Sequence, residues 1–472
     1  MSVSPGFPLV EELHPSLDVV AATRKLQSMP KLLVFDSALQ RNPVGRYSFL
    51  TADPILTWQN DAPQYGDDPF LALEAALGSH TSSSMEGLPP FQGGIAGLMG
   101  YELGQCFERI PTATHNEFQL PALAAGLYDW VMAWDHHQGR AWLISQGWPE
   151  VDPSRRSAQA ARRLQEVRER LSTDSPATTP QTSACLEIGQ LAPQFKVTGS
   201  SKLTSNFTRE DYLKAVRRVI EYIRAGDIFQ ANLTQRLLFP SEVDAVTLFE
   251  RLRRVNPAPF AGLMQWDDWA VISASPERFL RVDGRDVETR PIKGTRRRNR
   301  GPEADLFARD ELRESEKDQA ENVMIVDLLR NDLSRVCEPG SIRVPQLCGV
   351  ETYETVQHLV SEVRGRLRTD RTVWDLFRAA WPGGSITGAP KVRAMQIIAE
   401  LEPTARGPYC GSLFYVGANG QTDSSLLIRT FVQRKGWLQC GVGGGIVAQS
   451  DPNSEYEETL VKASGMIKAL GR

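Results

Sequence analysis

The hydrophobic residues of this chain follow two periods, one typical of strands and one typical of helices. Short apolar runs that end at turn residues predict strands. These runs are Leu32–Asp36, Tyr47–Ala52, Ala125–Trp134, Ala141–Ser145, Ala270–Ala274, Phe279–Val282, Leu426–Gln433 and Trp437–Val442.

Other stretches repeat their apolar residues at helical spacing. Thr208 is an N-cap candidate, and the residues from Tyr212 onward recur with the period of a helix. Helices are also predicted at Pro153–Leu171 and near 303–333, 372–381, 388–401 and 455–470. Strands and helices do not alternate as regular βαβ units, so the pattern predicts an α+β fold with largely antiparallel sheets.

A stretch rich in Ser, Thr and Pro divides the chain. We interpret residues 173–205 as a linker or long loop between an N-terminal region, 1–172, and a C-terminal region, 206–472. The two regions are expected to be intertwined in one fold.

Composition narrows the class of protein. Apolar residues make up 41% and charged residues 23% of the 472 positions, and the net charge is −4, so no nucleic-acid partner is expected. No signal sequence and no membrane-spanning run is recognisable, which favours a cytoplasmic protein without membrane contact. The cysteines lack CxxC spacing, which argues against a zinc site or a disulfide framework: Cys106, Cys185, Cys337, Cys348, Cys410 and Cys440.

Two acidic groups lie on predicted helices. Asp318 and Glu321 share a helical face that continues into apolar residues, and Glu455, Glu458 and Lys462 share another. Both groups could be ordinary helix surfaces, the second with a Glu458–Lys462 ion pair. If the two faces meet in one pocket, their carboxylates would provide the hard oxygen ligands that Mg²⁺ requires.

Two further segments suggest chemistry. Lys293 lies between Pro291 and Gly294 on a predicted turn, with arginines close by. A nucleophilic lysine must be neutral, and nearby cations favour the neutral form, although a basic surface turn has the same composition. The run Gly443–Gly445 would let the backbone approach an anion closely, or would simply form a turn.

Seven ordered blocks together resemble one family. They read PFQGGIAGLMGYELG, SPERF, PIKGT, AENVMIVDLLRND, HLVS, PGGSITGAPKVRAMQII and GGGIVAQSDPNSEYEE, and they spread over most of the chain. The blocks resemble the chorismate-utilising enzymes, which include anthranilate, aminodeoxychorismate, isochorismate and salicylate synthases. The resemblance implies an anthranilate synthase component I-like fold, in which two antiparallel sheets form a sandwich flanked by helices.

The resemblance also implies a Mg²⁺-dependent site for chorismate. It makes Glu321 and Glu458 metal ligands, with Glu455 beside the metal. The implied substrate contacts are Gln230, Thr295, His358, Thr387, Tyr409, Arg429, Gly443, Gly444, Gly445 and Lys462. Chorismate carries two carboxylates, and the cationic members of this set would complement them.

Two positions separate the reactions within the family. Anthranilate synthases read PIAGT where this chain reads PIKGT, and the lysine marks the aminodeoxychorismate branch. Isochorismate and salicylate synthases use a lysine base where this chain has Gln230, which cannot take a proton from water. The implied reaction is amination of chorismate at C4, with Lys293 adding at C2 and Glu277 acting as the acid.

Partners follow from the same resemblance. No amidotransferase block is recognisable, so a separate glutamine amidotransferase subunit is expected to supply ammonia. The resemblance also suggests an L-tryptophan pocket at Ser37, Arg46, Tyr47, Pro259 and Phe260. An anthranilate synthase is the alternative enzyme. A non-catalytic sensor of chorismate or tryptophan is the alternative class, but Glu277, Lys293 and the acidic ligands are all present.

Overall fold

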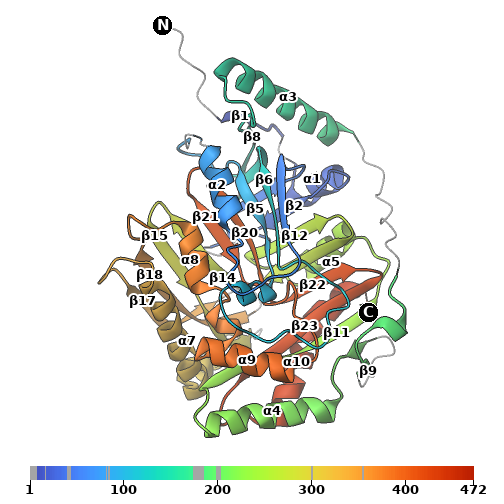
Figure 1. The fold of residues 1–472 in the computed structure, drawn as a ribbon, viewed down its shortest axis with the longest axis vertical. Helices are drawn as coiled ribbons and strands as arrows, with labels where there is room; N and C mark the ends of the chain where they lie inside the picture. Colours follow the sequence, from blue (N-terminus) through green and yellow to red (C-terminus); the bar gives the residue numbers. More distant parts are fainter. Residues whose placement is uncertain are drawn as a thin grey trace.

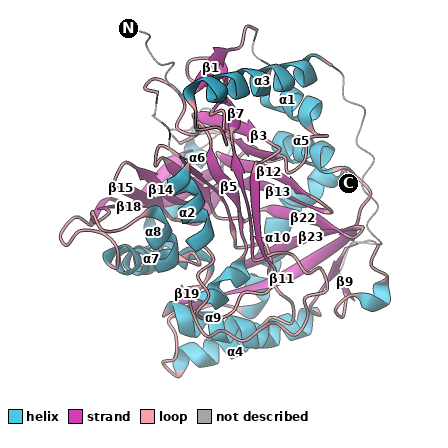
Figure 2. Cartoon of the chain, turned by 45° about the horizontal axis from the view of Figure 1, so that its top comes forward, coloured by secondary structure: helices cyan, strands magenta, loops and turns pink. Residues whose placement is uncertain are grey.

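The computed structural model describes residues 8–15, 17–39, 44–80, 82, 85–173, 185–197, 203–298, 301–352 and 356–471. Within these residues the strands form two antiparallel sheets, which Figure 2 shows at the centre of the molecule with helices around them. No helix of this part of the chain is both long and apolar enough to cross a bilayer. All six cysteines are free thiols.

The first sheet has 13 strands within the described residues. Their order is β1 (Leu9–Glu12), β8 (Arg140–Ser145), β7 (Trp130–Asp135), β3 (Tyr47–Thr51), β2 (Leu33–Asp36), β12 (Phe260–Trp266), β13 (Trp269–Ser275), β22 (Thr430–Arg434), β23 (Trp437–Ile446), β11 (Gln230–Pro240), β10 (Thr204–Ser205) and β9 (Phe195–Lys196), and β19 (Gly388–Ala389) pairs with β11.

The second sheet has 10 strands in the same part of the chain. Their order is β16 (Ile292–Arg297), β18 (Val356–Arg366), β15 (Asp286–Arg290), β14 (Arg278–Asp283), β21 (Thr422–Ser425), β20 (Ser412–Gly417), β5 (Gly94–Met99), β6 (Leu123–Tyr128) and β4 (Leu56–Asn60), and β17 (Arg343–Thr352) pairs with β18.

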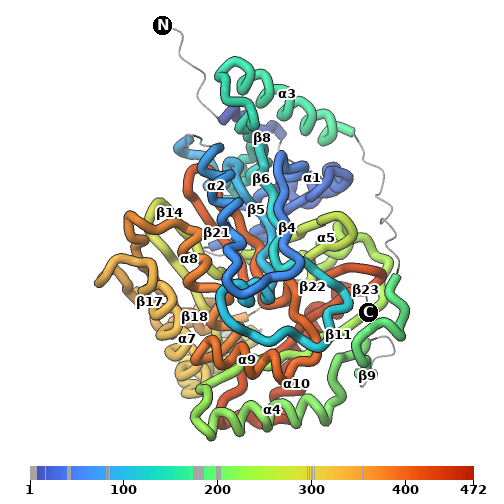
Figure 3. The backbone as a smooth tube through the Cα atoms, in the orientation of Figure 1, coloured from blue at the N-terminus to red at the C-terminus, as the bar shows by residue number. Residues whose placement is uncertain are grey.

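Both sheets take strands from both ends of the chain. In the first sheet β2 pairs with β12, and in the second β5 pairs with β20. Figure 3 shows the result, with blue N-terminal strands between yellow and red C-terminal ones. Part of the stretch expected to be a linker, β9 and β10, lies at the edge of the first sheet.

The α-helices cover the outer faces of the sheets (Figure 1). They are α1 (Val19–Leu26), α2 (Leu71–Ser79), α3 (Pro153–Ser172), α4 (Arg209–Arg224), α5 (Ala245–Val255), α6 (Pro302–Glu314), α7 (Glu316–Ser334), α8 (Val373–Ala380), α9 (Lys391–Leu401) and α10 (Pro452–Ile467). Short 3₁₀ turns include η3 (Gly384–Ile386).

Alternation along the strands places the core on both sides of each sheet. On β2, Leu33 belongs to the cluster that fills the space between the sheets, whereas Val34 packs with α1, α3 and α5 on the outer face. Successive strand side chains point to opposite faces, so a fully apolar strand indicates a sheet covered on both sides. A second outer cluster joins α7 and α8 to the other sheet.

The structure corrects three predicted boundaries. The run Ala125–Trp134 is interrupted at Asp129, so that β6 and β7 belong to different sheets. The helix predicted at 303–333 is broken at Ser315, whose hydroxyl caps α7 by accepting a hydrogen bond from the Asp318 amide, 3.3 Å away. The strand predicted from Leu426 begins only at Thr430, because the segment before it passes through a left-handed residue, Arg429, with φ +51°.

Candidate active site

Lys293 lies in β16 at a β-bulge, not on a free turn as the sequence suggested. Opposite β18, Lys293 faces Leu359 and Thr295 faces His358, with the irregularity between them. Gly294 occupies the bulge with φ +63°, and a Cβ there would be 2.7 Å from Leu312 Cδ1. A bulge redirects the neighbouring side chain, so Gly294 determines where Lys293 points.

Ser385 connects Lys293 with Glu277. The Lys293 ammonium donates to the Ser385 carbonyl at 3.3 Å, and the Ser385 hydroxyl donates to Glu277 Oε1 at 2.7 Å. Glu277 is almost fully buried, and burial raises the pKa of its carboxyl to about 7, against the opposing effects of Ser385 and Lys293. An amine and a carboxyl that is about half protonated near pH 7 therefore both contact Ser385 of η3.

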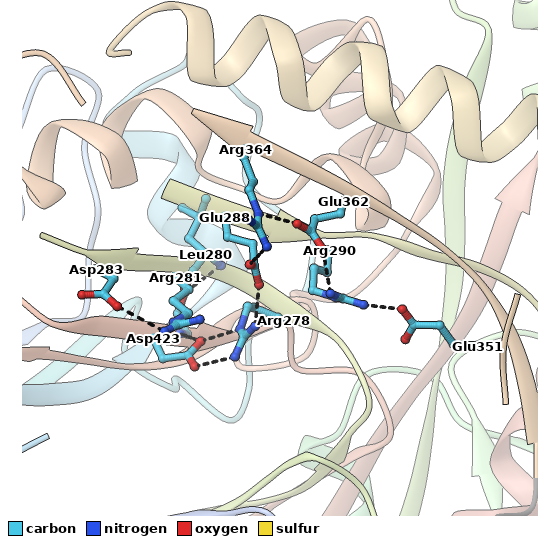
Figure 4. A network of polar contacts seen from close by, with 11 residues as sticks. Arg278, Leu280, Arg281, Asp283, Glu288, Arg290, Glu351, Glu362, Arg364 and Asp423 are labelled. Atoms are coloured by element: carbon cyan, nitrogen blue, oxygen red, sulfur yellow. Dashed lines mark hydrogen bonds and ion pairs between the residues drawn. The ribbon is translucent and has the colours of Figure 1, made fainter. Parts of the chain in front are cut away.

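Three of the arginines near Lys293 whose side chains are described do not supply the free positive charge that the sequence argument assumed. Arg290 binds Glu351 and Glu362, as Figure 4 shows. Arg296 and Arg298 likewise bind carboxylates on α6 and α7. These cations are neutralised locally, because each lies within ion-pair distance of a carboxylate. Lys293 itself is close enough to three carboxyls to lower their pKa values through its charge. They are Glu277, Glu321 and Glu458.

Glu321 of α7 and the two glutamates of α10 border two adjacent glycines of β23. A Cβ on Gly444 would lie 3.4 Å from Glu455 Oε2 and 3.8 Å from Glu458 Oε1. A Cβ on Gly445 would lie 3.5 Å from Glu321 Oε2. The two acidic helices predicted from the sequence are therefore brought together at one strand, which lacks side chains at that point.

Lysines are paired with the α10 glutamates in this conformation. Lys462 Nζ is 2.7 Å from Glu458, and Lys317 Nζ is 3.3 Å from Glu455. Among the described residues, no three metal-ligating side chains converge closely enough to hold an ion as they stand.

The glutamates nevertheless have the chemistry of a divalent-cation site. Burial raises the pKa of Glu321. Burial also acts to raise the pKa of Glu458, but Lys462, Lys317 and Lys293 outweigh it, so that pKa is lowered. An acidic set of hard oxygen donors beside bare glycine backbone fits Mg²⁺, provided that the lysines give way to it.

Gln230 lies beside Gly445, on the side of this glycine that also faces Glu321. Its side chain is buried, and its Oε1 has no hydrogen-bond donor among the described residues. A Cβ on Gly445 would overlap Gln230 Nε2. Glycine at 445 thus leaves room for Gln230, and the unpaired Oε1 is an acceptor that a ligand could satisfy.

Arg429 supplies the positive charge on this side of the site, and His358 lies close to it. Burial, together with the Arg429 charge, lowers the pKa of His358 to about 4, so the imidazole is neutral at pH 7. Arg429 is half-buried, and no acceptor for its guanidinium is found within the described part of the chain. A half-buried arginine with no acceptor among the described residues is suited to a carboxylate ligand. Thr295 lies opposite His358 in the ladder, but its side chain is outside the described residues.

The remaining predicted contacts have structural partners of their own. The Thr387 hydroxyl donates to the Gly383 carbonyl at 3.0 Å. Lys462 donates to the Gly443 carbonyl at 2.8 Å, which places it at the β23 glycines. Tyr409 packs its ring on Gly441 and is buried beside Arg406; no contact within the described residues joins it to Lys293.

Sequence reasoning missed Ser385, although it recognised the glycine-rich segment that contains it. Nothing in the spacing of this segment distinguishes its serine from a turn residue. The role becomes visible only when η3 is seen to lie against both β16 and the segment before β14.

The five residues of the suggested tryptophan pocket line one cavity of about 370 Å³ between the sheets. The Ser37 hydroxyl donates to the Tyr47 carbonyl at 2.7 Å, and Arg46 pairs with Asp135 at 2.7 Å. Phe260 lies under the Arg278 guanidinium, 4.9 Å from its ring centre. Arg278 begins the ion-pair network of Figure 4, which continues through Glu288 and Arg364 to Glu362 and Arg290.

Comparison with known protein families decides the family. The family described as chorismate binding enzyme matches residues 34–468 of this chain. The chain belongs to the chorismate binding enzymes. As a chorismate binding enzyme, it is 39% identical over 462 residues to aminodeoxychorismate synthase component 1 of Salmonella typhimurium, covering 94% of this chain and 93% of the relative. It is 42% identical over 426 residues to anthranilate synthase component 1 of Thermus thermophilus, covering 90% and 87%.

A solved structure confirms the predicted fold of this chorismate binding enzyme. Anthranilate synthase component I from Streptococcus pneumoniae superposes with a TM-score of 0.74 at 29% identity, over 89% of this chain and 92% of that one. The expected sandwich of two antiparallel sheets with flanking helices is therefore correct.

Proposed function

We propose that this chorismate binding enzyme converts chorismate and ammonia into 4-amino-4-deoxychorismate, on the route to p-aminobenzoate and folate. The observation that carries the proposal is that Ser385 of η3 contacts both Lys293 and Glu277, so that an amine and a buried acid lie at the same short turn. Relatives named for this reaction and for anthranilate synthesis are about equally similar, so overall identity does not choose between them. Lys293 favours the former.

The mechanism uses two displacements. The neutral Lys293 amine adds to C2 of the ring, both conjugated ring double bonds shift by one position, and the C4 hydroxyl leaves as water after taking the proton of Glu277. Ammonia then adds at C4, its excess proton passes to the Glu277 carboxylate, and the C2–Lys293 bond breaks to release the amine. Two allylic displacements through a covalent adduct replace one difficult direct substitution.

Glu277 suits the acid role because burial keeps its pKa near neutrality, at about 7. It can donate a proton in the first displacement and accept one in the second within a narrow pH range. The contact between Ser385 and both groups keeps the acid and the amine in fixed relation.

Substrate binding is assigned to the cationic side of the site. Arg429 has no internal acceptor in the described chain and would take one carboxylate of chorismate, with neutral His358 as a hydrogen-bonding neighbour. Lys462, Gln230 and the β23 glycines border the same space. We assign Thr295, Thr387 and Tyr409 as further contacts from the resemblance.

Mg²⁺ is the proposed cofactor. Glu321 and Glu458 would hold it, with Glu455 beside it. When bound, the ion would neutralise a substrate carboxylate against this acidic wall. Two further parts of the proposal are a cytoplasmic location, which suits the free thiols, and an amidotransferase partner, which suits relatives named component 1.

One assay tests the reaction. The protein is incubated with chorismate, Mg²⁺ and an ammonium salt, and the product is identified by mass and ultraviolet spectrum. We expect 4-amino-4-deoxychorismate; anthranilate would establish the alternative. Lys293→Arg keeps the charge but removes the nucleophile, so it should lose at least about 1000-fold in rate, roughly 4 kcal/mol of transition-state stabilisation. A rate near wild type would make Lys293 a cation for binding only.

We also propose that the cavity of about 370 Å³ at Phe260 binds L-tryptophan. Its aromatic lining and the arginines around it match an indole joined to a carboxylate. Calorimetric titration should show saturable binding of L-tryptophan, weakened by Phe260→Ala, with D-tryptophan as the ligand control. No heat of binding at millimolar ligand would reject this assignment.

A further inference from the structure

A second and larger cavity lies outside the site described above. It has a volume of about 820 Å³ and opens between α7, α8 and α9, next to β19. We call it the α7–α9 groove and define it by Phe229, Met324, Asp327, Leu328, Arg378 and Val392. None of these residues has a role in the proposed reaction.

Residues that line the groove also contact residues of the reaction site. A Cβ on Gly384 would lie 2.7 Å from Leu328 Cδ2, so these two residues are in direct contact. Gly384 immediately precedes Ser385, which touches both Lys293 and Glu277. Ala389, which also lines the groove, pairs with Gln230 in the ladder of β19 and β11. One layer of residues separates the groove from the reacting groups.

The rim of the groove carries an exposed aromatic side chain. Phe229 is 71% exposed, which is unusual for a phenylalanine, and it directly precedes buried Gln230. Its backbone is fixed, because its amide donates to the Ala389 carbonyl at 2.7 Å. An exposed aromatic group on a rigid backbone loses little entropy on binding and is a common anchor of protein interfaces.

Charged residues surround this apolar centre. Asp327 is 77% exposed in its side chain and pairs with Arg330, one turn along the helix, at 3.1 Å. Arg378 of α8 binds Asp68 and Glu74, and Lys391 of α9 binds Asp332 at 2.7 Å. An apolar centre with a polar, ion-paired rim is the usual anatomy of a specific protein–protein interface.

We propose that the α7–α9 groove docks the subunit that releases ammonia from glutamine. This inference rests on the proposed function, which requires neutral ammonia at Lys293 and Glu277. Ammonia released into water near neutral pH is mostly protonated and no longer nucleophilic, so the donor must be seated close to the reacting groups. In the groove, Leu328 lies against Gly384, the residue next to the Ser385 that contacts Lys293 and Glu277.

The test compares two nitrogen sources in the complex of the full chain with its amidotransferase subunit. Phe229→Ala and Asp327→Arg change the rim without touching the reacting groups. With ammonium salt, both variants should form product within about twofold of wild type. With glutamine and a limiting partner concentration, both should be slowed tenfold or more, and the partner's Kd should rise by a similar factor, which corresponds to about 1.4 kcal/mol.

Phe307→Ala is the matched control, because Phe307 is 72% exposed but lies on α6 outside the groove. It should leave both rates and the Kd unchanged. Wild-type Kd and glutamine-supported rates in both groove variants would overturn the proposal. Equal loss with ammonium and with glutamine would overturn it too, because the groove residues would then act through the reaction site. Failure of wild type to aminate chorismate with ammonium would instead reject the proposed function.

Discussion

At the scale of single residues, Ser385 contacts both proposed reacting groups through different atoms. Its carbonyl is fixed by the backbone of η3 and accepts from Lys293, whereas its hydroxyl can rotate and donates to Glu277. Lys293 was recognisable from its residue type and neighbours, and Glu277 through the resemblance of the SPERF block. Ser385 was not, because a positioning residue is defined by what it touches and not by what it can react with.

The pH dependence of the reaction should report on Ser385. Glu277 must be protonated to release the C4 hydroxyl, so the rate should fall as pH rises through about 7. The Ser385 hydroxyl favours the carboxylate and so lowers the pKa of Glu277; Ser385→Ala removes this effect and should move the alkaline limb to higher pH. The measurement is kcat against pH with the concentration of neutral ammonia held constant.

Ser385→Thr provides the control for this prediction, since it retains the hydroxyl at the same place. Its alkaline limb should coincide with that of wild type even if the added methyl group reduces the rate. A Ser385→Ala limb that does not move would show that Glu277 is not the group whose protonation limits the reaction.

At the scale of secondary structure, helix caps and continuous amphipathic patterns predicted where elements begin, but the sequence did not predict how the strands pair. The helix after Thr208 begins where the sequence indicated, with the Thr208 hydroxyl accepting from the Asp211 amide at 3.0 Å. The bulge at Gly294 was invisible, because a bulge is defined by its partner strand. The same holds for the convergence of α7 and α10 at β23, which depends on contacts distant in sequence.

Two glycines allow the bulge of β16 to be tested. Gly294 and Gly284 have nearly equal φ, +63° and +61°, but a Cβ meets Leu312 and Asp318 only at Gly294, while the space at Gly284 is open. Alanine at either position should lower the free energy of unfolding by about 1–2 kcal/mol, the cost of a left-handed conformation. Only Gly294→Ala should also slow the reaction, by tenfold or more, because an ångström of displacement at Lys293 can cost about 100-fold.

Chemical denaturation and steady-state rates measure the two effects separately. If Gly284→Ala slowed the reaction as much as Gly294→Ala, the loss would reflect general destabilisation. The geometry of the bulge would then not be needed to direct Lys293.

The pairing of α7 with α10 predicts how the protein should bind Mg²⁺. Glu458→Gln should weaken binding at least tenfold, because it removes one of two charged ligands from different helices. Glu457→Gln, on the next residue of α10 but 62% exposed and facing Arg209, should bind like wild type. Burial raises the pKa of Glu321, so protons should begin to displace the metal at a higher pH than at an ordinary carboxylate.

Calorimetric titration of Mg²⁺ in the absence of substrate measures this binding without relying on turnover. Far-ultraviolet circular dichroism confirms that each variant is folded. Identical titration curves for Glu458→Gln and Glu457→Gln would remove Glu458 from the metal site.

At the scale of the whole molecule, the catalytic strands depend on the N-terminal half for their position. Strands β2 and β3 lie between β7 and β12 in the first sheet, and β5 and β6 extend the second sheet beyond β20. Residues 173–205 therefore divide the sequence but not the fold, because strands from before this stretch form hydrogen bonds with strands from after it. A pattern of apolar residues predicts where a strand lies, but not with which strand, distant in sequence, it pairs.

This topology predicts the behaviour of fragments. Residues 206–472 alone would expose the edges of β12 and β20 and would lack β9 and β10, so we expect an aggregating product without cooperative unfolding. A chain divided by the removal of residues 174–184 keeps every described strand. Fragments 1–173 and 185–472, expressed together, should assemble into one complex that binds Mg²⁺ and aminates chorismate, because the pairings of β2 with β12 and β5 with β20 require no continuous chain. Size-exclusion chromatography and the ammonium-supported rate measure the assembly.

A fragment 206–472 that unfolded cooperatively and aminated chorismate by itself would contradict this prediction. The C-terminal region would then be an autonomous domain, and the shared sheets would not be needed to hold Lys293 and Glu277 in place.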